Sequence, residues 1–404
     1  MYPDKFPDFF DKCKIYTSVL ARVLKGMQQG IYPYFRSIEA QSENKVLHKG
    51  KWFIQIASND YLGLSQHPKV KEAAIKAVEK YGSSCCGSRF LNGTFDIHIE
   101  LEKRLAKFFE KEEALVFSTG FLTNLGTISA LSNKNDIIFS DRENHASILD
   151  GCRLSFAKTL KFKHNDAKNL EEILKNSDKN KGKFIVVDGV FSMIGNLSNL
   201  PSIVSLCNKY SARLMVDEAH GIGVLGKKGR GATEHFNVLD KVDIIMGTFS
   251  KSLASLGGFI ASSKEVTSFI KHLSREMIFT AALPPASVAA ALASLDIIEK
   301  EPERISKLWE NIKYMQNGFK ELGFNIANTQ SAIIPVIIGG DESTGKFGKI
   351  LEDEGIFANV VVSPAVPSGN ELIRTSYKAT HTKEDLDFVL EKFKKAGREL
   401  GIIK

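Results

Sequence analysis

A lysine among small hydroxylated residues is the feature of this sequence with the clearest chemical potential. Lys251 lies in the stretch GTFSKS at residues 247–252, directly after the apolar run 244–246. Earlier in the chain, Asp217 follows the apolar run 213–216. Short apolar runs of this kind fit buried parallel strands, and α/β sheets bind ligands at the carboxyl ends of their strands. The amine and the carboxylate are therefore predicted to meet at one site.

These groups match the needs of pyridoxal 5′-phosphate (PLP) chemistry. PLP requires an amine that forms an imine with it, an acid that keeps its pyridine nitrogen protonated, and donors for its phosphate. Lys251, Asp217 and the hydroxyls of Thr248 and Ser250 supply these three types of group. A lysine in a polar loop is more often a solvated side chain, so the prediction depends on its neighbours.

Two further segments place polar groups after predicted strands. Ser118-Thr119-Gly120-Phe121 leads from the run 114–117 into a helical pattern, and the free N–H groups at such a helix start could hold a phosphate. His145, in the stretch NHAS at 144–147, follows the run 136–139 and could lie over a cofactor ring. Taken alone, His145 would equally fit a helix cap or a core position.

Strands that alternate with amphipathic segments must position these groups. The alternation indicates βαβ units around a mostly parallel sheet, which is an α/β fold. Residues 58–295 are predicted to form this large domain, and residues 1–57 an N-terminal arm. The strand candidates are residues 114–118, 136–139, 184–187, 213–216, 244–246 and 258–261.

Residues 296–404 are predicted to form a smaller α+β domain. The pattern becomes helical near Ser287, before the predicted boundary. Beyond it the sequence predicts a strand at 333–338, a helix at 347–354, a strand at 372–376 and a final amphipathic helix from Glu384.

Composition is ordinary for a globular enzyme. The 404 residues are 43% hydrophobic and 25% charged, and 54 basic against 47 acidic residues give a net charge of +7 without a basic block. We therefore expect no nucleic-acid partner. Without an apolar run of membrane-spanning length or a signal-peptide pattern, we expect a cytoplasmic protein. The five cysteines have no zinc-like spacing, which predicts reduced structural thiols and no metal site.

Two short motifs suggest nucleotide binding, but their context does not fit. GIGVLG at 221–226 matches GxGxxG, yet it continues into Lys227 and Lys228 as a flexible loop, where a dinucleotide site needs a helix. GDESTGK at 340–346 resembles a P-loop, but Phe347 stands where Ser or Thr must ligate magnesium. We interpret the second as a polar loop that leads into a helix.

Seven stretches together carry a specific resemblance. In their sequence and order the chain resembles the α-oxoamine synthases of the fold-type I PLP superfamily, over roughly residues 30 to 400. The stretches are SNDYLGL at 58–64, GSRFLNGT at 87–94, ENHAS at 143–147, VFSM at 190–193, VDEAHGIGVLG at 216–226, GTFSK at 247–251 and LIR at 372–374.

The resemblance implies a large domain whose mostly parallel sheet is of the seven-stranded type, and it implies a role for each candidate residue. Lys251 would hold PLP and act as acid and base at the substrate α-carbon, Asp217 would pair with the pyridinium, and His145 would stack on the ring. His220 and Ser192 would hydrogen-bond to the phenolic oxygen of PLP. The residues near the phosphate of PLP would be Ser118, Gly120, Phe121, Thr248 and Ser250. Arg374, with Asn59 nearby, would bind the substrate carboxylate.

The implied reaction is a decarboxylating condensation of an amino acid with an acyl-CoA.

Two departures from the family pattern stand out. The loop after Ser192-Met193 reads Ile194-Gly195-Asn196 where acidic residues are frequent, and FTAALPP at 279–285 is poorer in Ser and Thr than usual. Thr280 is the residue left there to reach the phosphate bound by a partner subunit.

The branches of the family differ in their substrates, and the catalytic motifs do not separate them. They join serine to palmitoyl-CoA, alanine to a pimeloyl thioester, glycine to acetyl-CoA, or glycine to succinyl-CoA. YPYFR at 32–36, SKSLASLGG at 250–258 and AGRELG at 396–401 favour the serine and palmitoyl-CoA branch by likeness alone. A non-catalytic subunit of the same fold is disfavoured by the presence of Lys251. The resemblance also implies a homodimer, and a long-chain substrate implies at most transient peripheral contact with the inner membrane face.

Overall fold

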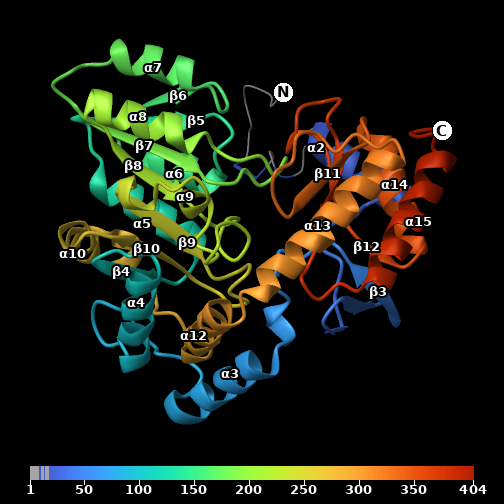
Figure 1. The fold of residues 1–404 in the computed structure, drawn as a ribbon, viewed down its shortest axis with the longest axis horizontal. Coiled ribbons are helices and arrows are strands. Elements are labelled where there is room, and N and C mark those ends of the chain that lie inside the picture. The colour runs from blue at the N-terminus through green and yellow to red at the C-terminus, as the bar shows by residue number, and fades with distance from the viewer. Residues whose placement is uncertain (1–8, 11–12, 14–17) are drawn as a thin grey trace.

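A seven-stranded sheet forms the centre of the larger of two lobes (Figure 1). The structure is a computed structural model that describes residues 9–10, 13 and 18–404. The order of the strands is β4-β10-β9-β8-β7-β5-β6; β10 runs antiparallel to both of its neighbours, and the other pairs are parallel. The bounds are β4 Glu113–Phe117, β5 Asp136–Asp141, β6 Lys158–Phe162, β7 Gly182–Asp188, β8 Arg213–Asp217, β9 Ile244–Thr248 and β10 Gly258–Ser262.

This sheet confirms the predicted α/β fold. Every predicted strand of the large domain is present, with ends that shift by one or two residues. The sequence prediction missed β6, whose burial alternates irregularly at the edge of the sheet. The mostly parallel order brings the carboxyl ends of β5, β7, β8 and β9 to one edge, which is where the polar segments begin.

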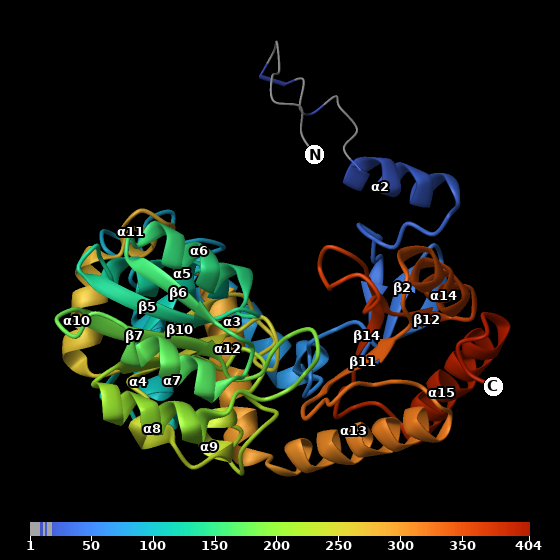
Figure 2. The ribbon, with the colours of Figure 1, turned by 90° about the horizontal axis from the view of Figure 1, so that it is seen from above.

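Apolar side chains of successive strand residues point to opposite faces of the sheet. In β7, Phe184 and Val186 join one core cluster, whereas Ile185 and Val187 join the other. Both faces are therefore covered by helices, as Figure 2 shows. These helices are α4 Asp96–Phe108, α5 Gly120–Leu131, α6 Ala146–Leu154, α7 Ala167–Lys175, α8 Leu200–Tyr210, α9 Ala232–His235, α10 Lys264–Leu273 and α11 Arg275–Ile278, with the 3-10 turn η2 Leu239–Lys241.

The second lobe contains a three-stranded antiparallel sheet in the order β11-β14-β13. α14 packs on this sheet and on α15. A cluster of aromatic rings from Phe319, Phe324, Phe347 and Phe393 fills its core. The bounds are β11 Ile333–Ile337, β13 Asn359–Val361, β14 Leu372–Ser376, α13 Glu303–Glu321, α14 Asp341–Asp353 and α15 Lys383–Glu399.

Strands from the N-terminal region complete the second lobe. β3 pairs in parallel with β12, so that Ile54 lies opposite Ile356, and the four-stranded sheet has the order β1-β2-β3-β12. The segment predicted as an arm thus contributes strands to a sheet that the C-terminal region finishes. The bounds are α2 Ser18–Gln28, β1 Ala40–Gln41, β2 Lys45–His48, β3 Lys51–Gln55 and β12 Ile356–Phe357.

Two segments connect the lobes. After β3 the chain passes through η1 Leu64–Gln66 into α3 Pro68–Tyr81, which packs closely against α12 Pro285–Lys300. α12 is followed by α13, which extends toward the second lobe (Figure 2). The site residues of the segment 58–63 therefore lie where the chain crosses between the lobes.

The two nucleotide-like motifs have structural roles. Residues 221–226 form turns and include no helix, as predicted, and an isolated bridge joins Ile222 to Arg230. The interpretation of GDESTGK as a loop is wrong, because α14 already begins at Asp341 and Gly340 is its N-cap residue, with φ 82°. The stretch that would cradle a nucleotide phosphate is thus helical.

The five cysteines are free. Among the described residues, no cluster of histidine, cysteine and acidic side chains is arranged to hold a metal ion. Within the same residues, no helix combines the length and apolar character that a membrane span requires.

Candidate active site

A cavity of about 290 Å³ lies at the carboxyl ends of β5, β7, β8 and β9. This volume is near the lower end of the range of small-molecule sites. The cavity brings together residues that are far apart in the sequence. Those predicted from the sequence are Gly120, Phe121, His145, Ser192, Asp217, His220, Thr248, Ser250 and Lys251.

Lys251 lies in the connection between β9 and β10. The connection is fixed at both ends because Thr248 and Gly258 are paired across the two strands, and Ser252 Oγ donates to the Ile222 carbonyl at 2.6 Å. Burial lowers the pKa of Lys251 to about 8, although the nearby Asp217 carboxylate acts in the opposite direction. A substantial fraction of this amine is therefore neutral near physiological pH.

Asp217 ends β8 with its side chain 3% exposed. Its Oδ2 accepts a hydrogen bond from Asn124 Nδ2 at 2.8 Å, and its Oδ1 accepts one from the Ala219 N–H at 2.9 Å. Asn124 also donates to Ser147 Oγ at 2.9 Å. These donors fix a carboxylate in the cavity, where a cationic ring nitrogen is the partner that it would favour.

A second carboxylate, Asp188, ends the neighbouring strand β7 and is paired in register with Asp217. Burial, reinforced by the proximity of Asp217, raises the pKa of Asp188 well above its usual range. Its Oδ2 accepts a hydrogen bond from the His145 backbone N–H at 2.7 Å. Asp188 thus holds the start of α6, where His145 is the N-cap residue and its ring remains exposed at the cavity.

His220 is buried and belongs to the loop that follows β8. Its Nδ1 lies 2.7 Å from the hydroxyl of Tyr61, and Tyr61 in turn lies 3.2 Å from Asn59 Oδ1. Arg374 Nη1 donates to the same Asn59 oxygen at 3.1 Å, and Arg374 Nε donates to the Ser192 carbonyl at 2.7 Å. Burial, followed by the positive charges of Lys251 and Arg374, lowers the pKa of His220 well below its usual range. The imidazole is therefore neutral.

The start of α5 and the end of β9 form a cradle for an anion. Thr119 caps the helix, and the N–H groups of Gly120 and Phe121 precede its first intrahelical hydrogen bond. Thr248 Oγ1 lies 2.9 Å from Ser250 Oγ. A Cβ added at Gly120 would lie only 2.7 Å from Thr248 Oγ1, so glycine keeps this cradle open.

The donor set of the cavity fits PLP. It offers an amine of lowered pKa, a buried carboxylate for the pyridine nitrogen, an exposed imidazole for stacking, and a cradle of N–H and hydroxyl groups for a phosphate. No other group is needed for a cofactor of this kind.

Four predicted residues lie outside the lining of this cavity. Ser118 Oγ donates to the Ala281 carbonyl at 2.5 Å, which directs it toward the segment that contains Thr280. Asn59 and Arg374 reach the cavity indirectly, through Tyr61 and the Ser192 carbonyl. The roles assigned to these four residues stay predictions.

Sequence reasoning gave no role to Asp188, Asn124 or Tyr61, whose contacts position the site. The sequence does indicate Asp188, because it ends an apolar strand in the same way as Asp217. It indicates Asn124 less strongly, since Asn124 stands four residues after Gly120 and thus on the same helical face. Tyr61 lies in the stretch SNDYLGL, but nothing local predicts its contact with His220, which spans 159 residues of sequence.

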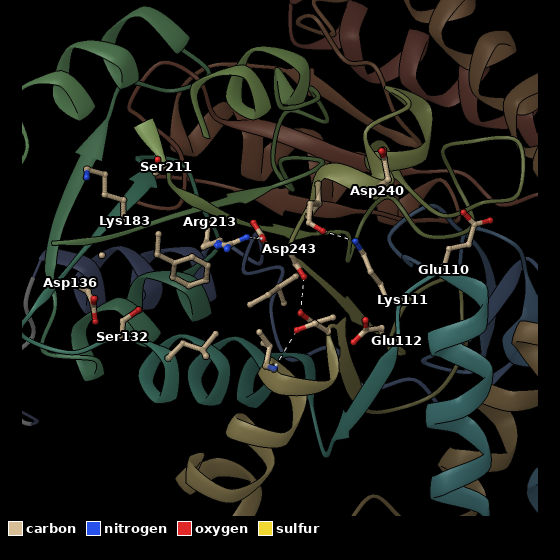
Figure 3. Close-up of a pocket in the computed structure, with 18 residues that line it drawn as sticks. Glu110, Lys111, Glu112, Ser132, Asp136, Lys183, Ser211, Arg213, Asp240 and Asp243 are labelled. Carbon is tan, nitrogen blue, oxygen red and sulfur yellow. Dashed lines mark hydrogen bonds and ion pairs between the residues drawn. The ribbon is translucent and has the colours of Figure 1, made fainter. Parts of the chain in front are cut away.

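A larger cavity, of about 650 Å³, lies at the opposite edge of the sheet, beside the first residues of β5, β7, β8 and β9 (Figure 3). Two of its basic side chains have partners within the chain. Arg213 Nη1 lies 2.7 Å from Asp243 Oδ1, and Lys111 Nζ donates to the carbonyls of Leu239 and Val242. These two cations are therefore already satisfied without a ligand.

Comparisons with known proteins agree with this geometry. The model of the aminotransferase class I and II family matches residues 52–393. A serine palmitoyltransferase of Bacteroides thetaiotaomicron is 51% identical over 379 residues, which cover 94% of this chain and 96% of the relative. An 8-amino-7-oxononanoate synthase of Thermoanaerobacter pseudethanolicus is 44% identical over 93% of this chain and 95% of the relative.

Solved structures give the same result. Structures of serine palmitoyltransferase with PLP, among them the S. paucimobilis enzyme with PLP and myriocin, superpose with a TM-score of 0.95 at 36% identity. They cover 98% of this chain and all of theirs. An 8-amino-7-oxononanoate synthase of Francisella tularensis superposes with a TM-score of 0.73 at 28% identity.

Proposed function

Because this chain belongs to the aminotransferase class I and II family, we propose that it condenses L-serine with palmitoyl-CoA, releasing CoA and CO2, with PLP as cofactor. The product is 3-ketodihydrosphingosine, the first intermediate of sphingolipid synthesis. The observation that carries the proposal is the small cavity in which Lys251, with a pKa lowered to about 8, accompanies the buried carboxylate of Asp217.

The residues of the cavity divide the binding of PLP among them. Asp217 would hold the protonated ring nitrogen, and the cradle at Gly120, Thr248 and Ser250 would hold the phosphate. When bound, PLP supplies the electron sink for a carbanion at the substrate α-carbon. His145 would cover one face of the ring, since its imidazole is exposed at the cavity.

Lys251 would transfer the protons at the substrate α-carbon. In the net reaction, a new C–C bond from the serine α-carbon replaces both the C–S bond of the thioester and the C–CO2 bond of serine. Lys251 would take the α-proton at the start and return a proton to the same carbon after CO2 has left. A lysine with a pKa of about 8 suits both steps near neutral pH.

Arg374 would bind the serine carboxylate. Arg374 is 7% exposed; its Nε donates to the Ser192 carbonyl, and its Nη1 donates to Asn59 Oδ1 and Ser376 Oγ. Among the described residues these contacts leave Nη2 as the nitrogen available to a carboxylate. Because Arg374 belongs to the second lobe and Ser192 to the first, substrate binding would occur where the lobes meet.

The quaternary structure proposed for the chain is a homodimer. Large apolar side chains that are exposed in the single chain support this proposal: Leu91 is 78% exposed and Phe279 is 76% exposed. Their segments lie side by side, because a β-bridge joins Ser88 to Ala281. A second copy that covers them would lie beside Thr280, the residue predicted to reach the partner's cofactor phosphate.

Transient contact with a membrane surface is part of the same proposal. The region around α2 exposes Leu24 and Met27, and the following segment exposes Phe35 at 98%. A peripheral protein of this type should sediment with vesicles of anionic lipid at low salt and be released by a salt wash. Retention after the wash would contradict the transient character.

The experiment that tests the function combines absorbance with CoA release. The purified protein should show the visible band of lysine-bound PLP, and Lys251→Ala should lack it while remaining folded. CoA release is then measured with serine, alanine or glycine, each combined with palmitoyl-CoA, pimeloyl-CoA or acetyl-CoA. Release with serine and palmitoyl-CoA is expected. Release only with alanine and pimeloyl-CoA would instead assign the oxononanoate reaction, which the 44% identity to those synthases makes the second candidate.

A further inference from the structure

The hydroxyl of Tyr61 lies between two hydrogen-bonding groups of the site. Tyr61 is fully buried, and its oxygen lies 2.7 Å from His220 Nδ1 and 3.2 Å from Asn59 Oδ1. An amide oxygen and an unprotonated imidazole nitrogen both accept hydrogen bonds. The single phenolic proton can therefore be donated to only one of the two at a time.

The neighbours determine where that proton points. Asn59 Oδ1 already accepts a hydrogen bond from Arg374 Nη1, whereas His220 Nδ1 has no other hydrogen-bond partner among the described residues. The shorter distance to His220 than to Asn59 also favours donation from Tyr61 to the imidazole.

We propose that Tyr61 is a positioning residue that donates its proton to His220 Nδ1 and so holds the imidazole as its Nε2–H tautomer. Nδ1 is then occupied, and Nε2–H is the donor that His220 presents to the cavity that it lines. The inference rests on the proposed function for the identity of the acceptor, which would be the phenolic oxygen of PLP.

This arrangement also connects the substrate subsite to the cofactor subsite. Arg374 donates to Asn59 Oδ1, and Asn59 Oδ1 is the second acceptor within reach of the Tyr61 proton. A carboxylate bound at Arg374 would draw the guanidinium toward itself and leave Asn59 Oδ1 free to compete with His220 for that proton. The donor strength of His220 would then respond to the presence of the amino acid.

The test uses the full chain labelled with 15N-histidine and the substitution Tyr61→Phe, which removes only the hydroxyl. Long-range 1H–15N spectra report the tautomer of His220, whose signal is identified by its loss in His220→Asn. The wild type should show a protonated Nε2 and an unprotonated Nδ1, with or without PLP. Tyr61→Phe should shift the populations toward Nδ1–H, move the visible absorbance of bound PLP, and weaken PLP binding about tenfold.

Tyr377→Phe is the matched control, because Tyr377 is equally buried and its hydroxyl makes no well-formed hydrogen bond among the described residues. It should leave all three readouts unchanged. An Nδ1–H tautomer in the wild type would overturn the proposal even if Tyr61→Phe did not fold, and so would an unchanged tautomer in a folded Tyr61→Phe. Failure to bind PLP would instead count against the proposed function, since the tautomer is read without the cofactor.

Discussion

Lys251 owes its lowered pKa mainly to burial, and this predicts the pH at which it reacts. The rate at which the protein freed of cofactor captures PLP should rise through a midpoint near pH 8. At that pH half of the amine is neutral, against roughly 0.3% for a lysine of ordinary pKa. Absorbance after rapid mixing with PLP measures the rate.

Asp217→Asn provides a second arm of the same measurement. The carboxylate of Asp217 raises the pKa of Lys251 against the effect of burial, so its removal should move the midpoint below that of the wild type. A wild-type midpoint near the ordinary lysine value would contradict the assignment of a buried, partly neutral amine.

Single residues also show how far the sequence informs about a site. Lys251, Asp217 and Gly120 could be predicted from the sequence, because each follows an apolar strand and has either a distinctive side-chain chemistry or a place in a turn. The role of Tyr61 could not be predicted, since it depends on a contact between its hydroxyl and His220 in the loop after β8. Local pattern predicts which residues stand at strand ends, whereas contacts across the lobes arise only from the tertiary fold.

The start of α5 is the element that would bind the phosphate of PLP, so a substitution there should weaken PLP binding. In Gly120→Ala, the new Cβ would lie 2.7 Å from Thr248 Oγ1 and force that hydroxyl into the cradle. The dissociation constant of PLP should rise at least about fivefold, which corresponds to the lower end, about 1 kcal/mol, of the cost of overpacking. Equilibrium binding followed by absorbance checks this.

Gly26→Ala in α2 is the matched control for this substitution, because the nearest atom to its new Cβ is 3.9 Å away. It should leave PLP binding unchanged. An unaltered dissociation constant in Gly120→Ala would show that the cradle is elsewhere.

The connection before α15 predicts a pH-dependent stability. His381 Nδ1 accepts from the Lys378 N–H, Nε2 faces the Gln55 carbonyl, and burial lowers the pKa of His381 to about 4. Between pH 6.5 and 4 the unfolded chain therefore binds more protons than the folded one. The free energy of unfolding should fall by up to about 3 kcal/mol as pH decreases through this window.

His381→Gln removes this proton uptake, so its deficit in unfolding free energy relative to the wild type should shrink as pH falls from 7 to 4. Urea denaturation at several pH values measures the difference. His272→Gln, at an exposed position, should follow the wild type in parallel. A constant deficit for His381→Gln would exclude the buried imidazole as the source.

Elements were predicted from sequence where burial is complete. The strands β7, β8 and β9 are continuous apolar runs, and all three were found within two residues of their ends. β6 reads KTLKF and is partly exposed, so its pattern is not that of a central strand. The start of α14 could not be predicted because Gly340 and the polar residues after it have the composition of a loop. In the structure the helix nevertheless begins at Asp341.

At the scale of the whole molecule, exposed apolar side chains predict assembly. If the proposed dimer buries Phe279, then Phe279→Asp should give a monomer in sedimentation velocity and lower CoA release at least about tenfold, because a charge in an apolar interface core is unfavourable. Phe35→Asp, 98% exposed on the other lobe, should remain dimeric. A monomeric wild type with full activity would contradict the dimer.

The parallel pairing of β3 with β12 imposes an order of events on synthesis. β3 leaves the ribosome long before β12, so the edge of β3 that does not pair with β2 stays open until Ile356 and Phe357 emerge. By then all seven strands of the large sheet, the last of which ends at Ser262, are available. A nascent chain at that stage can complete its first lobe while it still exposes an open strand edge. It is the stage at which chaperone protection would matter most.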